Sequence, residues 1–406
     1  MKTVLVFFDK ISDDSNQGFG FLNQRLAASL HKAGVLEKMV CLQRGPEVDI
    51  PPERTIALFD APHYRFAFQA LGKLTSIFPR FDSRRWKEIL FDLFMCRRLK
   101  MRKGDLLFCT RPLFLKTVQI AKSRRMKVWI MSSVPHPLLN FALVRNEELR
   151  LSLDSRGAYT DIRRVNRLNL VTNMADKVLT LAPEIGKFTH GSYLQFLGPD
   201  RILPQRKYFN LDPANYESLA ECRKDPGGEG ITFLHVSFMN LIKGIPYLLD
   251  AWSNFQSLGI PGCRLVLVGK IDPNVRFLLE TKYSNIHGVE IKGFVKDLPG
   301  EFAAAHVFIS PSISDAGPAT IIEAMASGLP VISSRNCGFA SLINERENGF
   351  TYAYNDVKRL TEIMAWFAQN PQEIPLLGQN ARSGVANRSI DDCAKEVLEL
   401  IHCAGD

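Results

Sequence analysis

Short apolar runs alternate with longer segments of helical spacing, and this alternation constrains the fold more than any other feature of the sequence. Apolar runs of four to six residues recur, and several lead directly into a segment with apolar residues three or four apart. The runs stand at residues 3–8, 105–110, 127–131, 176–182, 231–237, 263–269, 289–293, 307–312 and 330–334. Buried strands that alternate with helices are typical of parallel sheets built from βαβ units. The sequence therefore predicts an α/β fold.

The chain length and one polar interval predict two domains. At 406 residues the chain exceeds the size of an ordinary single core. Residues 210–230 are polar and rich in Pro and Gly, which is typical of an interdomain connection. We expect Rossmann-like doubly wound domains at 1–207 and 208–385, and a C-terminal helix at 386–406 that packs back toward the first domain. Ligands of such sheets bind at the carboxyl ends of the strands, so the two domains should face each other across a cleft.

Composition excludes several classes of protein. With 46% hydrophobic and 23% charged residues the chain is of the globular class, not disordered, collagen-like or membrane-embedded. The first ten residues predict a strand rather than a signal peptide, because their apolar run is short. Eight cysteines without a C-x-x-C spacing indicate reduced thiols. We therefore expect a cytoplasmic protein.

The positive charge is concentrated in one region. Residues 71–130 hold 16 Lys/Arg and 4 Asp/Glu, a local net charge of +12, whereas the whole chain has +9. Within this region, residues 83–105 mix basic side chains with Trp86, Phe91, Leu93, Phe94 and Met95. One interpretation is an amphipathic helix on the core. The other is a helix on an anionic membrane surface at the inner face, where the protein would reach a lipid-linked acceptor. Nucleic acid is disfavoured, because no known binding module accompanies the charge.

The segment at 311–332 predicts a ligand-binding helix start. Pro318 suits a first helical position and Gly328 suits a C-terminal cap, so a helix is expected over 318–327. Its first turn should offer free amides at Ala319, Thr320 and Ile321, which suits a phosphate. Asp315 and Glu323 flank this turn as acceptors for hydroxyl groups. The alternative is a plain capped helix, in which an acidic residue only caps the helix start.

This segment resembles the signature of the retaining glycosyltransferases of the GT-B fold, family 4, also called glycosyl transferases group 1. The family pattern is Glu, seven residues, Glu, then Ala-Met-Ala-x-Gly-x-Pro-Val; here Asp315 and Glu323 take the acidic positions and AMASGLPVI follows. The resemblance implies that Asp315 contacts donor-sugar hydroxyls and Glu323 the nucleotide ribose. It also implies that the 316–321 backbone (Ala316, Gly317, Pro318, Ala319, Thr320 and Ile321) holds the sugar and pyrophosphate. Asp315 replaces the family Glu, and Pro318 replaces a usual Gly.

Three weaker elements of the second domain fit the same family. Lys243, in a Lys-Gly unit after a strand, would neutralise the departing phosphate. Taken alone it is better explained as a surface lysine, and its register with the 315–323 signature favours the phosphate role. The family often has an Arg five or six residues earlier, where this chain has Ser237 and Phe238. Lys270, at a strand end, would lie near the phosphates, and the turn at Val295 near the nucleobase.

Two elements of the first domain are also candidates. Gly18 and Gly20 are expected in a tight loop before a helix, near the donor phosphates, although a plain turn is equally consistent with them. His136, in the loop after the strand at 127–131, is the candidate for positioning the donor sugar or the acceptor hydroxyl. The register of this loop leaves Ser132, Ser133 and His136 open, and His136 could equally be an ordinary loop residue.

The resemblance implies transfer of a sugar from a nucleotide diphosphate, UDP or GDP, to an acceptor hydroxyl with retained configuration. Polysaccharide or glycolipid biosynthesis is the expected setting. No metal is expected at the donor site, and no cofactor is required; the sequence has no Asp-x-Asp. Two alternatives remain open: a sugar-nucleotide epimerase of the same fold, and a non-catalytic protein that binds sugar nucleotides.

Overall fold

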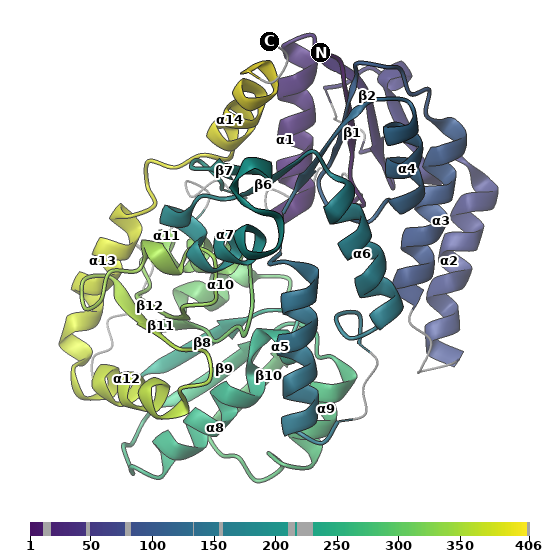
Figure 1. Ribbon diagram of the computed structural model, residues 1–406. Helices are drawn as coiled ribbons and strands as arrows, with labels where there is room; N and C mark the ends of the chain where they lie inside the picture. The colour runs from purple at the N-terminus through teal and green to yellow at the C-terminus, as the bar shows by residue number, and fades with distance from the viewer. Residues whose placement is uncertain are drawn as a thin grey trace.

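Two parallel β-sheets organise the protein (Figure 1). The computed structural model describes residues 1–10, 18–45, 49–77, 83–132, 134–153, 157–209, 216 and 230–403. The first sheet has the order β3-β2-β1-β4-β5-β6-β7 and the second the order β10-β9-β8-β11-β12-β13. Every strand pair in both sheets is parallel. The predicted α/β architecture of two Rossmann-like domains is confirmed.

The strands of the first sheet are β1 (Thr3–Val6), β2 (Leu36–Cys41), β3 (Thr55–Ala57), β4 (Leu106–Cys109), β5 (Lys127–Met131), β6 (Lys177–Leu181) and β7 (Ile202–Gln205). Those of the second sheet are β8 (Thr232–Val236), β9 (Arg264–Val268), β10 (Val289–Gly293), β11 (Val307–Ser310), β12 (Val331–Ser334) and β13 (Gly349–Tyr352). The central strands β1, β4, β8 and β11 are buried along their whole length. Helices cover both faces of a parallel sheet, which explains why these strands are continuous apolar runs.

The first half of the chain forms the helices α1 (Gly18–Lys32), α2 (Pro62–Ile77), α3 (Ser83–Arg98), α4 (Leu115–Ser123), α5 (Pro137–Arg150), α6 (Ile162–Met174) and α7 (Pro183–Leu197). The second half forms α8 (Ile245–Gln256), α9 (Pro273–Glu280), α10 (Leu298–Ala303), α11 (Ala319–Ala326), α12 (Val357–Gln369), α13 (Ile374–Ser383) and α14 (Ile390–Cys403). None of the helices within the described residues has the length and apolar character needed to cross a membrane.

Four strands were not among the apolar runs of the sequence. β3 and β7 form the two edges of the first sheet, and β13 forms an edge of the second. An edge strand has one neighbour and is short here, so it needs fewer apolar residues. β2 lies inside the first sheet, but Glu37 and Lys38 interrupt its apolar pattern. The weak signal of these strands therefore has a physical cause.

The C-terminal helix α14 lies against the first domain, beside α1 (Figure 1). Glu396 of α14 accepts hydrogen bonds from the backbone amides of Arg206 and Lys207, each at 2.9 Å. Asp391 lies 3.8 Å from Arg25 of α1. These contacts join the end of the chain to the first sheet, whereas α12 and α13 remain with the second.

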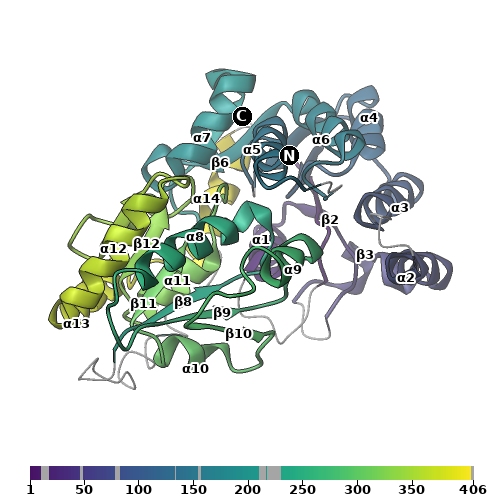
Figure 2. The same ribbon diagram turned by 90° about the horizontal axis from the view of Figure 1, so that it is seen from below.

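The basic region at 71–130 includes α3, which packs beside α2 at the side of the molecule remote from α12 and α13 (Figure 2). Three apolar residues of α3, Phe91, Phe94 and Met95, are buried in the core. Trp86 of α3 is 42% exposed and Phe66 of α2 is 74% exposed. The apolar side of α3 therefore packs on the core, as the amphipathic interpretation predicts. Among the described residues of α2 and α3, Phe66 and Trp86 are the only large apolar side chains that remain exposed.

Candidate functional site

The loop between β11 and α11 is fixed by the segment that follows β12. The backbone amide of Asp315 donates to the carbonyl of Asn336 at 3.1 Å, and the amide of Gly338 donates to the carbonyl of Asp315 at 2.7 Å. A Cβ atom at Gly338 would stand only 1.4 Å from the carbonyl oxygen of Ala316, so a side chain there would displace the loop. Asp315 therefore stands in a rigid position at the carboxyl end of β11.

Lys243 forms an ion pair with Asp315 of this loop. Lys243 ends the 3₁₀ turn at Leu241–Lys243, and Gly244 follows with a left-handed φ of 70°. A Cβ at Gly244 would lie 2.0 Å from the carbonyl oxygen of Pro311, so the turn can approach the β11 loop only with glycine there. Burial alone would lower the pKa of Lys243, but the carboxylate of Asp315 outweighs it and raises that pKa. The lysine is therefore charged.

The start of α11 differs in two details from the sequence prediction. Pro318 is the N-terminal cap, with extended backbone, and the helix covers Ala319–Ala326 rather than 318–327. The amide of Ile321 donates to the carbonyl of Pro318 at 3.0 Å, so it is not free as predicted. The φ of Pro318, −67°, is compatible with a helix, and its ψ of 116° places it just outside; a tight first turn then takes up the third amide. Ala319 and Thr320 carry the remaining predicted amides.

The next residues of the predicted loop, Ala316 and Gly317, are packed closely against their neighbours. Ala316 is buried, and Gly317 donates its amide to Oδ1 of Asp315 at 3.3 Å. A Cβ at Gly317 would lie 3.1 Å from the ring of Phe339 and 3.3 Å from the ring of Tyr208. The side chain of Asp315 is thus bonded to its own loop on one oxygen and to Lys243 on the other.

Glu323 is buried in the second turn of α11 and is 2% exposed. The hydroxyl of Tyr216 donates to its Oε1 at 3.0 Å. Its Oε2 is buried and has no hydrogen-bond partner among the described residues. Burial raises the pKa of Glu323 to about 7, although the Tyr216 hydrogen bond opposes this. One oxygen of the carboxylate is therefore left to accept a hydrogen bond from a ligand.

Ser237 directly follows β8 and is half-buried. Nδ1 of His235 lies 2.8 Å from the carbonyl oxygen of Ile309, and its Nε2 lies 2.7 Å from Oγ of Ser237. Burial lowers the pKa of His235 to about 4, so the ring is neutral at pH 7. A carbonyl can only accept, so Nδ1 carries the proton and the Ser237 hydroxyl donates to Nε2. The oxygen of Ser237 is left as an acceptor.

Lys270 and Val295 lie on neighbouring loops of the same sheet. Lys270 is exposed, and its ammonium stands 5.7 Å from the centre of the Phe294 ring. Val295 is half-buried and follows β10. The structure brings Lys243 to Asp315 in the loop that leads to Glu323, whereas Lys270 follows the neighbouring strand β9 and Val295 follows the edge strand β10.

Gly18 and Gly20 are in the first turn of α1, which corrects the prediction of a loop at these positions. The prediction had placed the two glycines in a tight loop ahead of the helix. The apolar spacing that begins at Phe21 instead continues into this turn, where a helix tolerates glycine. A Cβ at Gly20 would lie 3.3 Å from the carbonyl oxygen of Lys10, so the helix start runs close to the end of the β1 loop.

His136 is fully buried at the start of α5. Its ring stacks on Phe196 at a centroid distance of 4.0 Å and meets Tyr193 edge-on at 5.3 Å. Neither ring nitrogen has a hydrogen-bond partner among the described residues, and burial lowers the pKa of His136 to about 4. A direct role in the reaction would require this ring to be uncovered. Ser132 is also buried, with its hydroxyl donating to the carbonyl of Val134 at 2.7 Å, and Ser133 lies outside the described residues.

A cavity of about 230 Å³ opens in the first domain beside these groups. It is lined by the loops after β4 and β5 and by the starts of α3, α5 and α6, including Arg84, Arg111, Tyr159, Arg164 and Asn140. Ser314, the neighbour of Asp315, donates its hydroxyl to Oδ1 of Asn140 at 2.5 Å. Asn140 therefore joins the wall of the cavity to the Asp315 loop. The lining is apolar with three arginines, each paired with a carboxylate: Arg84 and Arg164 with Glu88, and Arg111 with Asp9.

Asn140, Ser314 and Tyr216 were missed by sequence reasoning. Asn140 follows His136 by one helical turn, so an N-terminal cap at His136 would have directed attention to it. Ser314 precedes the signature by one residue. Tyr216 has no local signal, because it stands in the polar connection between the domains. In the described part of the chain, no cluster of three or more His, Cys, Asp or Glu has the arrangement of a metal site.

The second sheet carries a recognisable family domain. Residues 230–370 match the family described as glycosyl transferases group 1. An uncharacterized glycosyltransferase of Haemophilus influenzae is 25% identical over 224 residues, which are 53% of this chain and 58% of that protein. The UDP-Gal:alpha-D-GlcNAc-diphosphoundecaprenol alpha-1,3-galactosyltransferase of Escherichia coli is 25% identical over 130 residues, 32% of this chain and 33% of that protein. The chain thus matches less than two thirds of the length of either relative.

Solved structures extend the similarity of fold to the whole chain. Sucrose-phosphate synthase from Thermosynechococcus elongatus superposes with a TM-score of 0.67 at 19% identity, covering 100% of this chain and 99% of that one. Anabaena HepE in complex with UDP-glucose gives a TM-score of 0.62 at 16% identity, covering 98% and 99%. Residues 230–370 therefore match the glycosyl transferases group 1 family, within a chain that has the two-domain GT-B fold.

Proposed function

We propose that this protein is a glycosyltransferase that moves a sugar from a UDP- or GDP-sugar to an acceptor hydroxyl with retention of configuration. The observation that carries the proposal is the ion pair of Lys243 and Asp315 at the start of α11, inside the matched domain. A cation and an acid held together beside a helix N-terminus provide one group for the diphosphate and one for sugar hydroxyls. The signature at Asp315–Glu323 and the UDP-glucose bound by HepE support a nucleotide sugar as the donor.

Donor binding would exchange the partners of this ion pair. The diphosphate would take the ammonium of Lys243, and the freed carboxylate of Asp315 would accept hydrogen bonds from the sugar. The amides of Ala319 and Thr320 would hold phosphate oxygens, and the unpartnered oxygen of Glu323 would accept from the ribose. Because Asp315 is one methylene shorter than Glu, the site should prefer a sugar that approaches the loop closely.

The transfer itself needs no paired carboxylates. The acceptor oxygen would form a bond to the anomeric carbon while the bond from that carbon to the phosphate oxygen breaks. The acceptor proton would pass to the departing phosphate oxygen on the same face of the sugar, and Lys243 would stabilise the negative charge left on the diphosphate. The residues proposed for the donor side are Lys243, Asp315, Glu323, Ser237, Lys270 and Val295.

The acceptor is proposed to enter the cavity of the first domain. Arg84, Arg111 and Arg164 line it, and Asn140 joins it to the Asp315 loop. The E. coli relative acts on an acceptor joined to diphosphoundecaprenol, which supports a saccharide or lipid-linked acceptor here too. Polysaccharide or glycolipid biosynthesis is the proposed setting, at the cytoplasmic face of a membrane.

Contact with an anionic membrane is proposed through the surface made by Phe66, Trp86 and the basic residues of α2 and α3. In α2 the basic Arg65 and the apolar Phe66 are adjacent and both exposed, so a cation and an apolar group would reach a lipid surface together. Co-sedimentation with phosphatidylglycerol vesicles should fall with added salt and in the Trp86→Ser variant. Binding that is equal on neutral vesicles and insensitive to salt would contradict this contact.

A donor screen followed by a transfer assay tests the function. Thermal shift with UDP- and GDP-sugars identifies the stabilising donor, and labelled donor is then incubated with saccharide and lipid-linked acceptors. We expect stabilisation by one nucleotide sugar and label in the acceptor. Binding without release of nucleotide would favour a non-catalytic binding protein. Conversion of the donor sugar in the absence of acceptor would favour an epimerase.

A further inference from the structure

Helix α5 belongs to the first half of the chain but packs on the second domain (Figure 1). Its Val144 is part of the hydrophobic core of the second domain, together with residues such as Ile242 and Leu248. The helix also contacts the 3₁₀ turn Leu241–Lys243, which carries the candidate lysine. One helix therefore touches the lysine turn, the Asp315 loop through Asn140, and the acceptor-side cavity.

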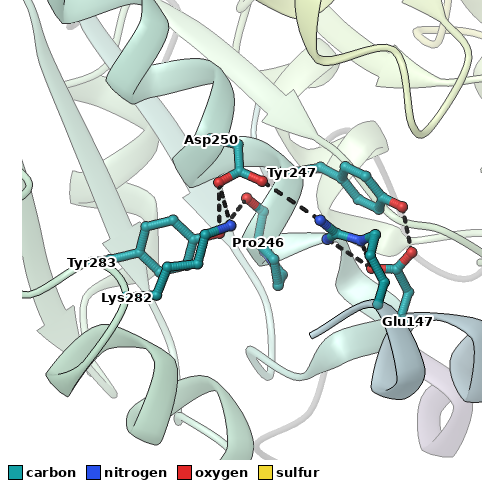
Figure 3. Close-up of polar contacts among 7 residues, drawn as sticks. Glu147, Pro246, Tyr247, Asp250, Lys282 and Tyr283 are labelled. Carbon is teal, nitrogen blue, oxygen red and sulfur yellow. Dashed lines mark hydrogen bonds and ion pairs between the residues drawn. The ribbon is translucent and has the colours of Figure 1, made fainter. Parts of the chain in front are cut away.

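The C-terminal half of α5 is held by a polar network across the domain boundary (Figure 3). Glu147, which is buried, accepts a hydrogen bond from the hydroxyl of Tyr247 of α8. Arg150 donates to Oε2 of Glu147 from Nε at 3.0 Å and from a terminal nitrogen at 2.9 Å. Its guanidinium lies 4.3 Å from the centre of the Tyr247 ring. A buried carboxylate held by a tyrosine and an arginine gives a contact of defined geometry.

The same network extends into the second domain. Arg150 lies 3.7 Å from Asp250, which accepts from Lys282 at 2.7 Å and from the hydroxyl of Tyr283 at 2.8 Å. The same hydroxyl lies 3.0 Å from the carbonyl oxygen of Pro246, so its single hydrogen is shared between the two acceptors. Asp250 is thus held within its own domain by Lys282 as well as by Tyr283, so it stays in place for Arg150 when the Tyr283 contact alone is lost (Figure 3).

Resting on the glycosyltransferase function proposed above, we propose that α5 sets the acceptor side against the donor side. In this role Glu147, Arg150 and Tyr247 are positioning residues. They fix the helix on the second domain, and the helix then holds Asn140 against Ser314 beside the Lys243–Asp315 pair. The distance from the cross-domain network to Asn140 is two helical turns, over which a helix is stiff. A small shift of the acceptor relative to the donor slows transfer strongly, since reacting atoms must be held in near-attack geometry.

Tyr247→Phe removes only the hydroxyl that crosses the domain boundary. We expect kcat for transfer to fall about tenfold or more, because the acceptor is no longer held in the correct position relative to the donor. The dissociation constant of the nucleoside diphosphate and the rate of donor hydrolysis without acceptor should stay unchanged, since both depend on the second domain. Amide hydrogen exchange in residues 137–150 should become faster.

Tyr283→Phe is the matched control. It removes a tyrosine hydroxyl from the same network, but one whose partners Asp250 and Pro246 both lie in the second domain. This variant should leave the ratio of transfer to hydrolysis and the exchange of 137–150 as in the unchanged protein. Arg150→Met, at a partly exposed side chain, replaces Tyr247→Phe if the latter fails to fold, with the same expected outcomes.

Equal effects of Tyr247→Phe and Tyr283→Phe on the transfer-to-hydrolysis ratio would overturn the positioning role. Unchanged hydrogen exchange in α5 of Tyr247→Phe would overturn it as well. If the unchanged protein transfers no sugar to any acceptor tested, the proposed function fails. The exchange measurement still decides whether the network holds α5 on the second domain.

Discussion

The ammonium group of Lys243 forms an ion pair with the carboxylate of Asp315, 72 residues further along the chain. Gly244 permits the approach, because its left-handed backbone passes under the carbonyl of Pro311 where a Cβ has no room. Each residue neutralises the charge of the other. In the proposed function, both would become available to a ligand that brings its own negative charge and hydroxyl groups.

Lys243→Met should abolish most of the transfer activity. Loss of one preorganised cation at a departing diphosphate costs about a hundredfold to a thousandfold in kcat. Steady-state kinetics with the donor found in the screen provide the measurement. Lys292→Met is the control, since Lys292 forms an ion pair with Glu301 within the same domain but away from the α11 loop. Equal losses in both variants would contradict the assignment of Lys243.

Asp315→Asn should shift the alkaline limb of the pH profile of transfer activity to lower pH. Asp315 keeps the pKa of Lys243 raised against the opposing effect of burial. Without the carboxylate, burial dominates and the lysine loses its proton at a lower pH. Asp315→Glu retains the charge, so its alkaline limb should stay in place while its donor preference changes. An unshifted limb in Asp315→Asn would mean that another group sets it.

Glu323→Gln should stabilise the protein, and this gain in stability over the unchanged protein should grow as the pH rises. The folded state holds the proton of Glu323 up to about pH 7, whereas the unfolded chain releases it near 4.5. The folded state binds more protons between these values, so the contribution of this carboxyl to stability falls as pH rises through that window. The free energy of unfolding should therefore be higher in Glu323→Gln than in the unchanged protein, by about 3 kcal/mol at pH 8 and by less than about 1 kcal/mol at pH 5.

Urea unfolding of Glu323→Gln and the unchanged protein at these two pH values measures the difference. Glutamine can still accept from Tyr216, so packing should be preserved. A stability difference that is the same at both pH values would show that the carboxyl is not held neutral.

His136→Phe should reduce the loss of stability on acidification. Burial lowers the pKa of His136 to about 4 from 6.5, so the unfolded chain binds a proton that the folded protein excludes. The stability contribution of the neutral ring is present above 6.5 and is lost as pH falls toward 4. Between pH 7 and pH 5 the unchanged protein should lose about 2 kcal/mol more than the variant. Thermal or urea unfolding across this range measures it, and parallel curves would contradict it.

The sequence alone determined the α/β class, the two domains and the position of the signature segment. These depend on local patterns: continuous apolar runs for buried parallel strands, and a Gly and a Pro that end α11. Local sequence patterns predicted the start of α11 to within one residue of where the structure has it. They placed Gly18 and Gly20 in a loop, although the helical spacing of the following residues extends through them.

Only the tertiary structure decided which groups meet. The contacts of Lys243 with Asp315, Asn140 with Ser314, Tyr216 with Glu323 and Tyr247 with Glu147 join residues 72 to 174 positions apart. No local propensity encodes such pairs. The Lys243–Asp315 pair depends on β8 and β11 lying side by side in the second sheet, whereas the Asn140–Ser314 and Tyr247–Glu147 pairs depend on how the two domains are set against each other. The burial of His136 is of the same kind: the sequence shows a histidine between prolines, and the packing of α7 on α5 removes it from solvent.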